Sequence, residues 1–214
     1  MGKPVDPKGV FVAYPTRIFI DFWNFSLQWR DRADGNRVDW LQIPPVLLEE
    51  GEKRLKQAGL EDELHLEETL VYASHDEGEK GRKLKGWLDN WLDKQPSFRV
   101  KTRKRGSRPK AIHCRECGHE LENCPECDVA YRSSPEKGVD SAIVTDLLSL
   151  ASEEAFEVAI LVSSDADFVP AVDWLQSRGF KVINATWARH GFELAKISWA
   201  SMELDSVMAE LTRG

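Results

Sequence analysis

The chain has 214 residues, 42% of them hydrophobic and eight of them tryptophan, which excludes a disordered chain and suits one globular domain over residues 1–214. No apolar run approaches the ~20 residues that span a bilayer, and the first ten residues lack the apolar core of a secretory signal, so we expect a soluble, cytoplasmic protein without a membrane partner. The formal net charge of −7 argues against nucleic acid as a partner unless positive charge is concentrated locally.

Strand-like and helix-like segments alternate along the chain. Hydrophobic periodicity predicts strands at 17–20, 66–73, 98–104, 158–163 and 180–185, and helices at 44–59, 79–95, 137–151 and 166–178, before a helical tail. This order predicts an α/β fold with a mainly parallel sheet that is covered on both faces. Such sheets carry their functional residues just past the carboxyl ends of the strands.

Asp21 ends the first predicted strand, and Asn24 follows three residues later. An acid in this position lies where the sheet opens to a ligand. A simple cap on the following turn explains it equally well.

A dense basic run interrupts the acidic chain between residues 99 and 110. It contains seven basic residues and no acid: Arg99, Lys101, Arg103, Lys104, Arg105, Arg108 and Lys110. Without them the net charge of −7 becomes −14, so positive charge is concentrated in one anion-binding segment. The alternative is a solvated loop or a charged edge strand that discourages aggregation. Phosphate becomes the better partner if a phosphate-handling site lies nearby.

All four cysteines form one cluster with the spacing C-x2-C-x6-C-x2-C, namely Cys114, Cys117, Cys124 and Cys127. Each C-x2-C turn aims two sulfurs at one ion, and two turns supply the four thiolates that structural zinc prefers. We expect a compact zinc-binding insertion at 111–131 within the single domain. Two disulfides or a redox pair are the alternatives, and the absence of a secretion signal disfavours the first.

Asp140 is the most informative acid in the sequence. Helical spacing places it over Ile143, Val144 and Leu147, the apolar face of the predicted helix, whereas Asp146 points away as an ordinary surface acid. A buried carboxylate is costly unless it is paired, neutralised or bound to a metal. This position therefore favours a functional site over a buried ion pair.

Asp165 and Asp167 follow the strand predicted at 158–163 and lead into a helix. Helix capping accounts for one of them but leaves the second to be explained. In a doubly wound sheet these two acids, Asp21 and Asp140 converge at one edge, where their mutual repulsion calls for a hard divalent cation such as magnesium or manganese. Attack of metal-activated water on a phosphodiester is the natural chemistry of such a site.

Three segments, 19–24, 136–140 and 162–168, resemble the NYN family of the PIN-like nuclease superfamily, most closely its LabA-like branch. The resemblance implies a PIN-like Rossmannoid three-layer fold and metal-dependent ribonuclease activity. It assigns Asp21, Asp140, Asp165 and Asp167 to the acidic positions and Asn24 to the family's asparagine. Some relatives carry a cysteine-rich zinc insertion before the same helix. Phe22 and Trp23 depart from the family by being bulky, which affects the pocket mouth.

The first hypothesis is a ribonuclease that prefers RNA to DNA. The four acids hold Mg2+ or Mn2+, Asn24 and Ser164 orient water or phosphate, and Lys137 contacts a phosphate. The basic run and the insertion bind the RNA backbone. Trp23 is expected to pack in the core, with base stacking as the alternative.

The second hypothesis is a non-catalytic RNA- or protein-binding module with vestigial acids or a structural cation. A small-molecule phosphatase is disfavoured because the D-x-D signature at the first strand lacks its second acid. The helix that carries Trp87 and Trp91 faces either the core or a second copy of the chain in a homo-oligomer.

Overall fold

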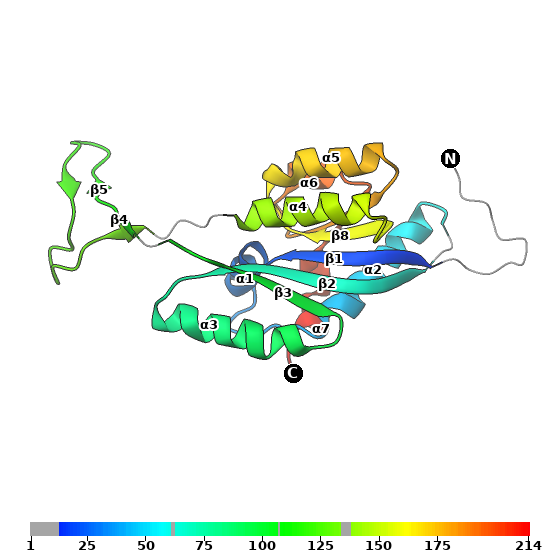
Figure 1. Cartoon of the computed structure of the whole chain (residues 1–214), viewed down its shortest axis with the longest axis horizontal. Coiled ribbons are helices and arrows are strands. Elements are labelled where there is room, and N and C mark those ends of the chain that lie inside the picture. Colours follow the sequence, from blue (N-terminus) through cyan, green and yellow to red (C-terminus); the bar gives the residue numbers. More distant parts are fainter. Residues whose placement is uncertain (1–12, 61–62, 107, 134–137) are drawn as a thin grey trace, which may run out of the picture.

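A parallel six-stranded sheet forms the centre of the computed structural model, which describes residues 13–60, 63–106, 108–133 and 138–214 (Figure 1). The strand order is β10-β9-β8-β1-β2-β3. The strands are β1 (Tyr14–Asp21), β2 (Leu64–His75), β3 (Phe98–Lys104), β8 (Val158–Val162), β9 (Lys181–Thr186) and β10 (Ala200–Glu203). Every residue of β8 is buried because β8 lies between two strands and two helical layers.

Helices cover both faces of this sheet and bury two separate hydrophobic clusters (Figure 1). On one face lie α1 (Phe22–Arg32), α2 (Ile43–Gln57), α3 (Glu79–Asn90) and α7 (Met208–Leu211), and on the other lie α4 (Val139–Ser152), α5 (Val169–Ser177) and α6 (Phe192–Ile197). Short 3-10 turns occupy Leu92–Lys94, Ala166–Phe168 and Leu204–Val207. The predicted three-layer α/β fold is confirmed.

Helix α1 was missing from the sequence-based elements. It begins directly after β1, and Phe22, Phe25 and Trp29 bury one of its faces. Their i, i+3, i+7 spacing is a helical signal that sequence reasoning missed, because aromatic residues are also common in strands.

The predicted helical tail is wrong at residues 200–203. This segment is β10, which pairs in parallel with β9 at the edge of the sheet. A four-residue strand with one buried residue has no readable period, and its conformation is decided by the open edge of β9.

The cysteine-rich segment projects from the sheet between β3 and α4 (Figure 1). It contains two antiparallel two-stranded ribbons, β4 (Arg108–Pro109) with β7 (Arg132–Ser133) and β5 (Ile112–His113) with β6 (Glu120–Leu121). Its large apolar residues are exposed, Val129 by 62%, so the segment has no hydrophobic core of its own.

In the part of the chain that the structure describes, none of the helices combines the length and the apolar character needed to cross a membrane.

Candidate active site

Three acids gather at the carboxyl edge of the sheet. One carboxylate oxygen from each of Asp140, Asp165 and Asp167 lies within 4.8 Å of the others, and this is the group of three or more possible metal ligands found among the described residues. Asp165 and Asp167 follow the end of β8, where the Asp165 carboxylate accepts a hydrogen bond from the backbone N–H of Asp167 (2.9 Å). Asp140 lies in the first turn of α4, which Gly138 begins with a left-handed backbone (φ 79°) that favours glycine.

Asp21 lies deeper and outside this group of three. Its side chain is buried, and one carboxylate oxygen accepts from the backbone N–H of Asn24 (3.2 Å), which caps α1. The Ser163 hydroxyl donates to the other oxygen (3.4 Å) and accepts from the backbone N–H of Asp165 (3.2 Å). Ser163 thus links the buried acid to the exposed group, and the sequence analysis did not single it out.

The predicted burial of Asp140 is wrong. Val139, Ile143 and Leu147 form the buried stripe of α4, and Asp140 points away from that stripe into solvent. The stripe follows i, i+4, i+8 spacing, which leaves residue 140 to one side. Asp140 therefore belongs to the acid group because of its place in the first turn.

The prediction for Asp146 is also wrong, because this acid lies in a hydrogen-bonded network. Its carboxylate accepts from the Tyr72 hydroxyl (2.6 Å) and pairs with the Lys101 ammonium (2.5 Å). Burial, followed by the hydrogen bond to Asp146, raises the pKa of the Tyr72 hydroxyl. Tyr72 and Lys101 come from β2 and β3, so no helical pattern could reveal them.

Asn24 and Ser164 hold each other in place. The Asn24 side-chain carbonyl accepts from the backbone N–H of Ser164 (3.0 Å), and the Ser164 hydroxyl shares a hydrogen bond with the Thr186 hydroxyl (2.7 Å). These contacts connect α1, the loop after β8 and the end of β9. Their direct effect is to fix the loop that carries Asp165 and Asp167.

Asn184, on the neighbouring strand β9, holds the same loop by hydrogen bonds. Sequence reasoning missed it. Its buried amide nitrogen donates to the carbonyls of Leu161 (3.1 Å) and Ser163 (2.8 Å). An asparagine inside the otherwise apolar run 182–185 is the signal that could have found it.

The family model named "NYN domain" matches residues 15–198. The chain belongs to the NYN domain family. This family is part of the PIN-like nuclease superfamily, and the match covers five of the six strands of the sheet, leaving out the edge strand β10 and the first residue of β1. Membership in the LabA-like branch stays a prediction.

A solved structure has a similar fold: the crystal structure of a protein of unknown function from Vibrio parahaemolyticus, with 19% sequence identity and a TM-score of 0.55. The alignment covers 94% of this chain and 97% of that one. At this identity the likeness concerns the fold alone. None of the curated proteins matches the chain.

Some basic residues of this NYN domain's basic run form ion pairs with acids of the same chain, and others are exposed on the surface. Arg99 pairs with Glu68 (2.6 Å), Lys101 with Asp146 and Lys104 with Glu77 (2.5 Å). Arg103 is exposed and, with Lys101, lines a groove of about 430 Å³ along the first half of α4. The Arg108 side chain and Lys137 lie outside the described residues, and Lys110 is exposed at the base of the insertion.

Arg105, within the basic run, lies in a different environment. Its guanidinium lies over the Trp23 ring, 4.7 Å from the centroid, and donates to the Ser74 hydroxyl (2.7 Å). The Trp23 indole donates to the Ser74 carbonyl (2.8 Å). Trp23 is half-buried, so its ring is neither core nor fully open surface.

The four cysteines form two turns with the same hydrogen bonds. The Cys114 N–H donates to the His119 carbonyl (2.8 Å) and the Cys114 carbonyl accepts from Gly118 (2.9 Å), while Cys124 makes the matching bonds to Val129 and Asp128 (2.9 Å each). Backbone N–H groups, first that of Cys117, lower the pKa of the Cys114 thiol, and the N–H of Glu126 does so first for Cys124.

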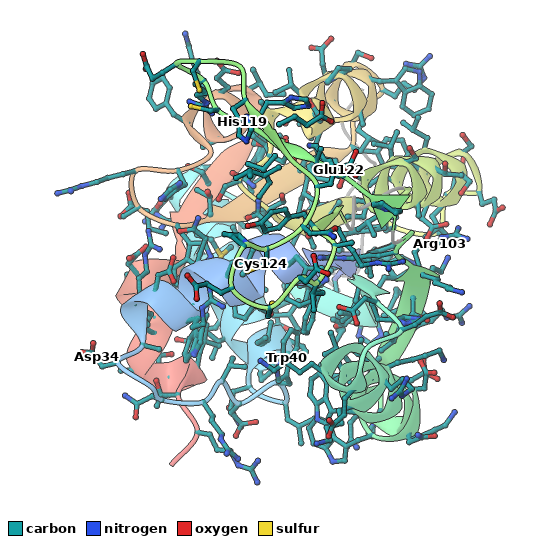
Figure 2. All side chains as sticks on the ribbon, turned by 90° about the vertical axis from the view of Figure 1, so that its left-hand side faces the viewer. Asp34, Trp40, Arg103, His119, Glu122 and Cys124 are labelled. Atoms are coloured by element: carbon teal, nitrogen blue, oxygen red, sulfur yellow. The ribbon has the colours of Figure 1, made fainter. Side chains whose placement is uncertain are left out.

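The two cysteine turns lie apart, as the positions of His119 and Cys124 show in Figure 2. No three of the four described cysteine sulfurs lie within 4.8 Å of one another. Each turn is thus formed as a pair of thiols, and the predicted set of four thiolates around one ion is not assembled in this structure.

Proposed function

We propose that this NYN domain is a metal-dependent ribonuclease that cuts phosphodiester bonds at the carboxyl edge of its sheet. The observation that carries the proposal is the group of three carboxylates, Asp140, Asp165 and Asp167, gathered within 4.8 Å in a member of the PIN-like nuclease superfamily. Like charges at this separation repel each other, and a divalent cation relieves the repulsion.

The donor set fits Mg2+ or Mn2+. All the donors are carboxylate oxygens, the ligands that hard cations prefer. When bound, such an ion activates water and neutralises charge on the leaving oxygen. We assign the direct contacts to the three gathered acids. Asp21 holds the loop in register through Ser163 and adds a fourth negative charge behind them.

RNA would approach along the groove between β3 and α4. Arg103 supplies positive charge on one side, whereas the Lys101 ammonium is paired with Asp146, and the groove also contacts Gly138, two residues before Asp140. A phosphate backbone in this groove would be led toward the acids. The choice of RNA over DNA rests on the family, and the cytoplasm is the expected compartment.

For the cysteine-rich segment we propose one structural zinc ion held by Cys114, Cys117, Cys124 and Cys127. The matched hydrogen bonds of the two turns and the lowered thiol pKa values suit thiolate ligands. Binding would have to draw the two turns together, and it would stabilise a segment that has no apolar core.

The test is Asp140→Asn, assayed with single-stranded RNA and Mn2+. Removing one ligand charge should lower the cleavage rate by about 100-fold or more, because the ion is lost or displaced, while circular dichroism and the melting temperature stay unchanged. Asp173→Asn, an exposed acid on α5 away from the group, is the control and should cleave normally. Normal cleavage by Asp140→Asn would refute the mechanism.

A non-catalytic RNA-binding module is the second candidate. It is favoured by the position of Asp21, which is engaged in capping α1 and does not join the three gathered acids. RNA binding that persists in EDTA, with no products after Mn2+ is added to the wild-type protein, would establish this candidate instead.

A further inference from the structure

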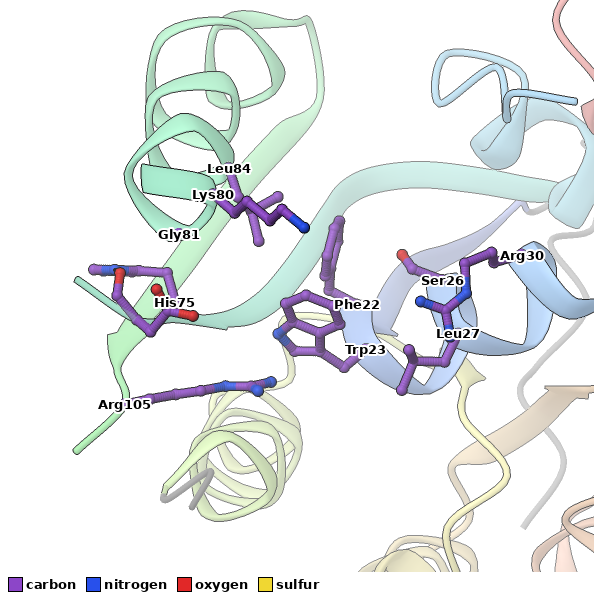
Figure 3. Close-up of a pocket in the computed structure, with 11 residues that line it drawn as sticks. Phe22, Trp23, Ser26, Leu27, Arg30, His75, Lys80, Gly81, Leu84 and Arg105 are labelled. Atoms are coloured by element: carbon purple, nitrogen blue, oxygen red, sulfur yellow. The ribbon is translucent and has the colours of Figure 1, made fainter. Parts of the chain in front are cut away.

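A cavity of about 440 Å³ lies between the first turns of α1 and α3 and the end of β2. Figure 3 shows Phe22 and Trp23, at the start of α1, with the α3 side chains Lys80 and Leu84 on one side and side chains from later in α1 on the other. Ser26, Leu27 and Arg30 are those α1 side chains. The volume falls in the range of small-molecule sites and suits a single nucleotide.

The cavity is preformed by close packing of α3 on the end of β2. A side chain at Gly81 would place its Cβ 2.2 Å from the Asp76 carbonyl, so only glycine allows this approach. The Trp23 ring is held by its hydrogen bond to Ser74 and by the Arg105 guanidinium. The aromatic surface is therefore fixed before any ligand arrives, which lowers the entropic cost of binding.

The lining combines apolar surface with a positive rim. Phe22, Trp23, Leu27 and Leu84 are apolar, and Leu27 is 40% exposed. Arg30, Lys80 and Arg105 bring positive charge, and His75 adds a ring nitrogen. Asp76 is the acid in the lining, and its carboxylate accepts from the backbone N–H of Gly78 (2.7 Å). An aromatic surface beneath several cations suits a flat base attached to phosphate.

The cavity adjoins the buried acid Asp21 through the chain itself. Asp21 is followed at once by Phe22 and Trp23, and Arg105 touches Trp23 where β3 ends. Because Ser163 links Asp21 to the loop of Asp165, the cavity opens beside the residue that connects to the gathered acids.

We propose that this cavity binds one unstacked base of single-stranded RNA, next to the phosphodiester held at the acids. The inference rests on the proposed function for its choice of RNA. The base packs against Trp23, which lies beside the buried Phe22, and Arg30, Lys80 and Arg105 contact the adjoining phosphates. Trp23 then stacks on the base. This is the alternative to core packing that the sequence left open.

The experiment measures binding in EDTA, so that cleavage does not enter. Fluorescence anisotropy follows a short fluorescein-labelled single-stranded RNA, intact or with one base removed at each position in turn. Ser26→Trp fills the cavity from α1 and should weaken binding of intact RNA by about tenfold, as expected for one lost base–aromatic stack. Removing the bound base should weaken wild-type binding equally and leave Ser26→Trp unaffected.

A pair of lysine variants provides a matched control that does not alter packing. Lys80 and Lys83 are both exposed on α3, but only Lys80 lines the cavity. Lys80→Ala should weaken binding by severalfold and Lys83→Ala should not. The proposal is overturned if Ser26→Trp binds intact RNA as the wild type does, or if Lys80→Ala and Lys83→Ala bind alike. Base-dependent binding without cleavage in Mn2+ would refute the nuclease and leave this site standing.

Discussion

At the scale of single residues, the Ser163 hydroxyl joins two acids from different parts of the sheet. It donates to the buried Asp21 carboxylate and accepts from the backbone of Asp165. Ser163→Ala leaves that carboxylate with one buried partner fewer, which should lower the free energy of unfolding by about 1–3 kcal/mol. It should also raise the Mn2+ concentration needed for half-maximal cleavage, because the Asp165 loop loses its anchor.

Denaturant unfolding and a manganese titration of the cleavage rate measure these two effects. Ser177→Ala, in an exposed position at the end of α5, is the control for loss of a hydroxyl. A Ser163→Ala protein with the wild-type manganese response would show that the link has no part in the site.

Tyr72 gives a prediction for the dependence of stability on pH. Burial and the Asp146 carboxylate raise the pKa of its hydroxyl in the folded protein above the value of about 10 in the unfolded chain. The folded state therefore favours the protonated form, so this contribution is complete below pH ~10 and is lost as the pH rises further.

Tyr72→Phe removes that contribution together with the hydrogen bond. Unfolding free energies measured by urea from pH 7 to 11 should fall more steeply above pH ~10 for the wild type than for Tyr72→Phe. The difference between the two proteins cancels the titration of lysines. Parallel curves would contradict the raised pKa.

At the scale of elements, alternate residues of β3 face α4, and the basic side chains among them differ in whether they are already paired with an acid. Arg99 is already paired with Glu68, whereas Arg103 is exposed on the groove. Arg103→Ala should weaken RNA binding severalfold and reduce the slope of log K against log salt by about 0.7, the value for one phosphate contact with a single strand. Arg99→Ala should change both quantities less.

Anisotropy at several salt concentrations in EDTA measures both quantities for the two variants. Equal effects would show that the ion pair with Glu68 does not withdraw Arg99 from RNA. A smaller loss for Arg103→Ala than for Arg99→Ala would place the RNA path elsewhere.

The sequence predicted the elements whose local pattern determines their conformation. It did not predict features that depend on contacts with distant residues. Asp165 and Asp167 were placed at the carboxyl edge because they follow an apolar strand, and parallel strands end at one edge, whereas Asp21 ends such a strand but lies outside the group of three acids. The hydrogen-bonded role of the half-buried Asp146 depends on Tyr72, 74 residues away, and β10 depends on the free edge of β9. Neither leaves a local signal, because both arise from contacts between distant segments.

At the scale of the whole molecule, the cysteine-rich segment is set apart from the layered body. The Lys110 N–H donates to the Tyr131 carbonyl (3.0 Å), so the ends of 111–131 meet. Replacing 111–131 with a two-residue turn should preserve cooperative unfolding and the melting temperature within a few degrees. The full chain should hold one zinc ion and the shortened chain none, because all four cysteines are removed.

Differential scanning calorimetry and metal analysis measure the two outcomes, with Cys117→Ser as a control that should lose zinc but keep the domain. Collapse of the shortened chain would show that the segment is integral to the fold. Zinc retained by Cys117→Ser would rule out the four-thiolate site.

Because all six strands run parallel, the three gathered acids lie at the carboxyl edge of the sheet and the opposite, amino edge lies away from them. Helix α4 starts beside Asp140 and runs 14 residues to Ser152, so its far end lies about 20 Å away from the acids. The exposed turn at Glu153 and Glu154 follows there. A fluorophore or an affinity handle attached at that turn would leave access to the RNA path unobstructed.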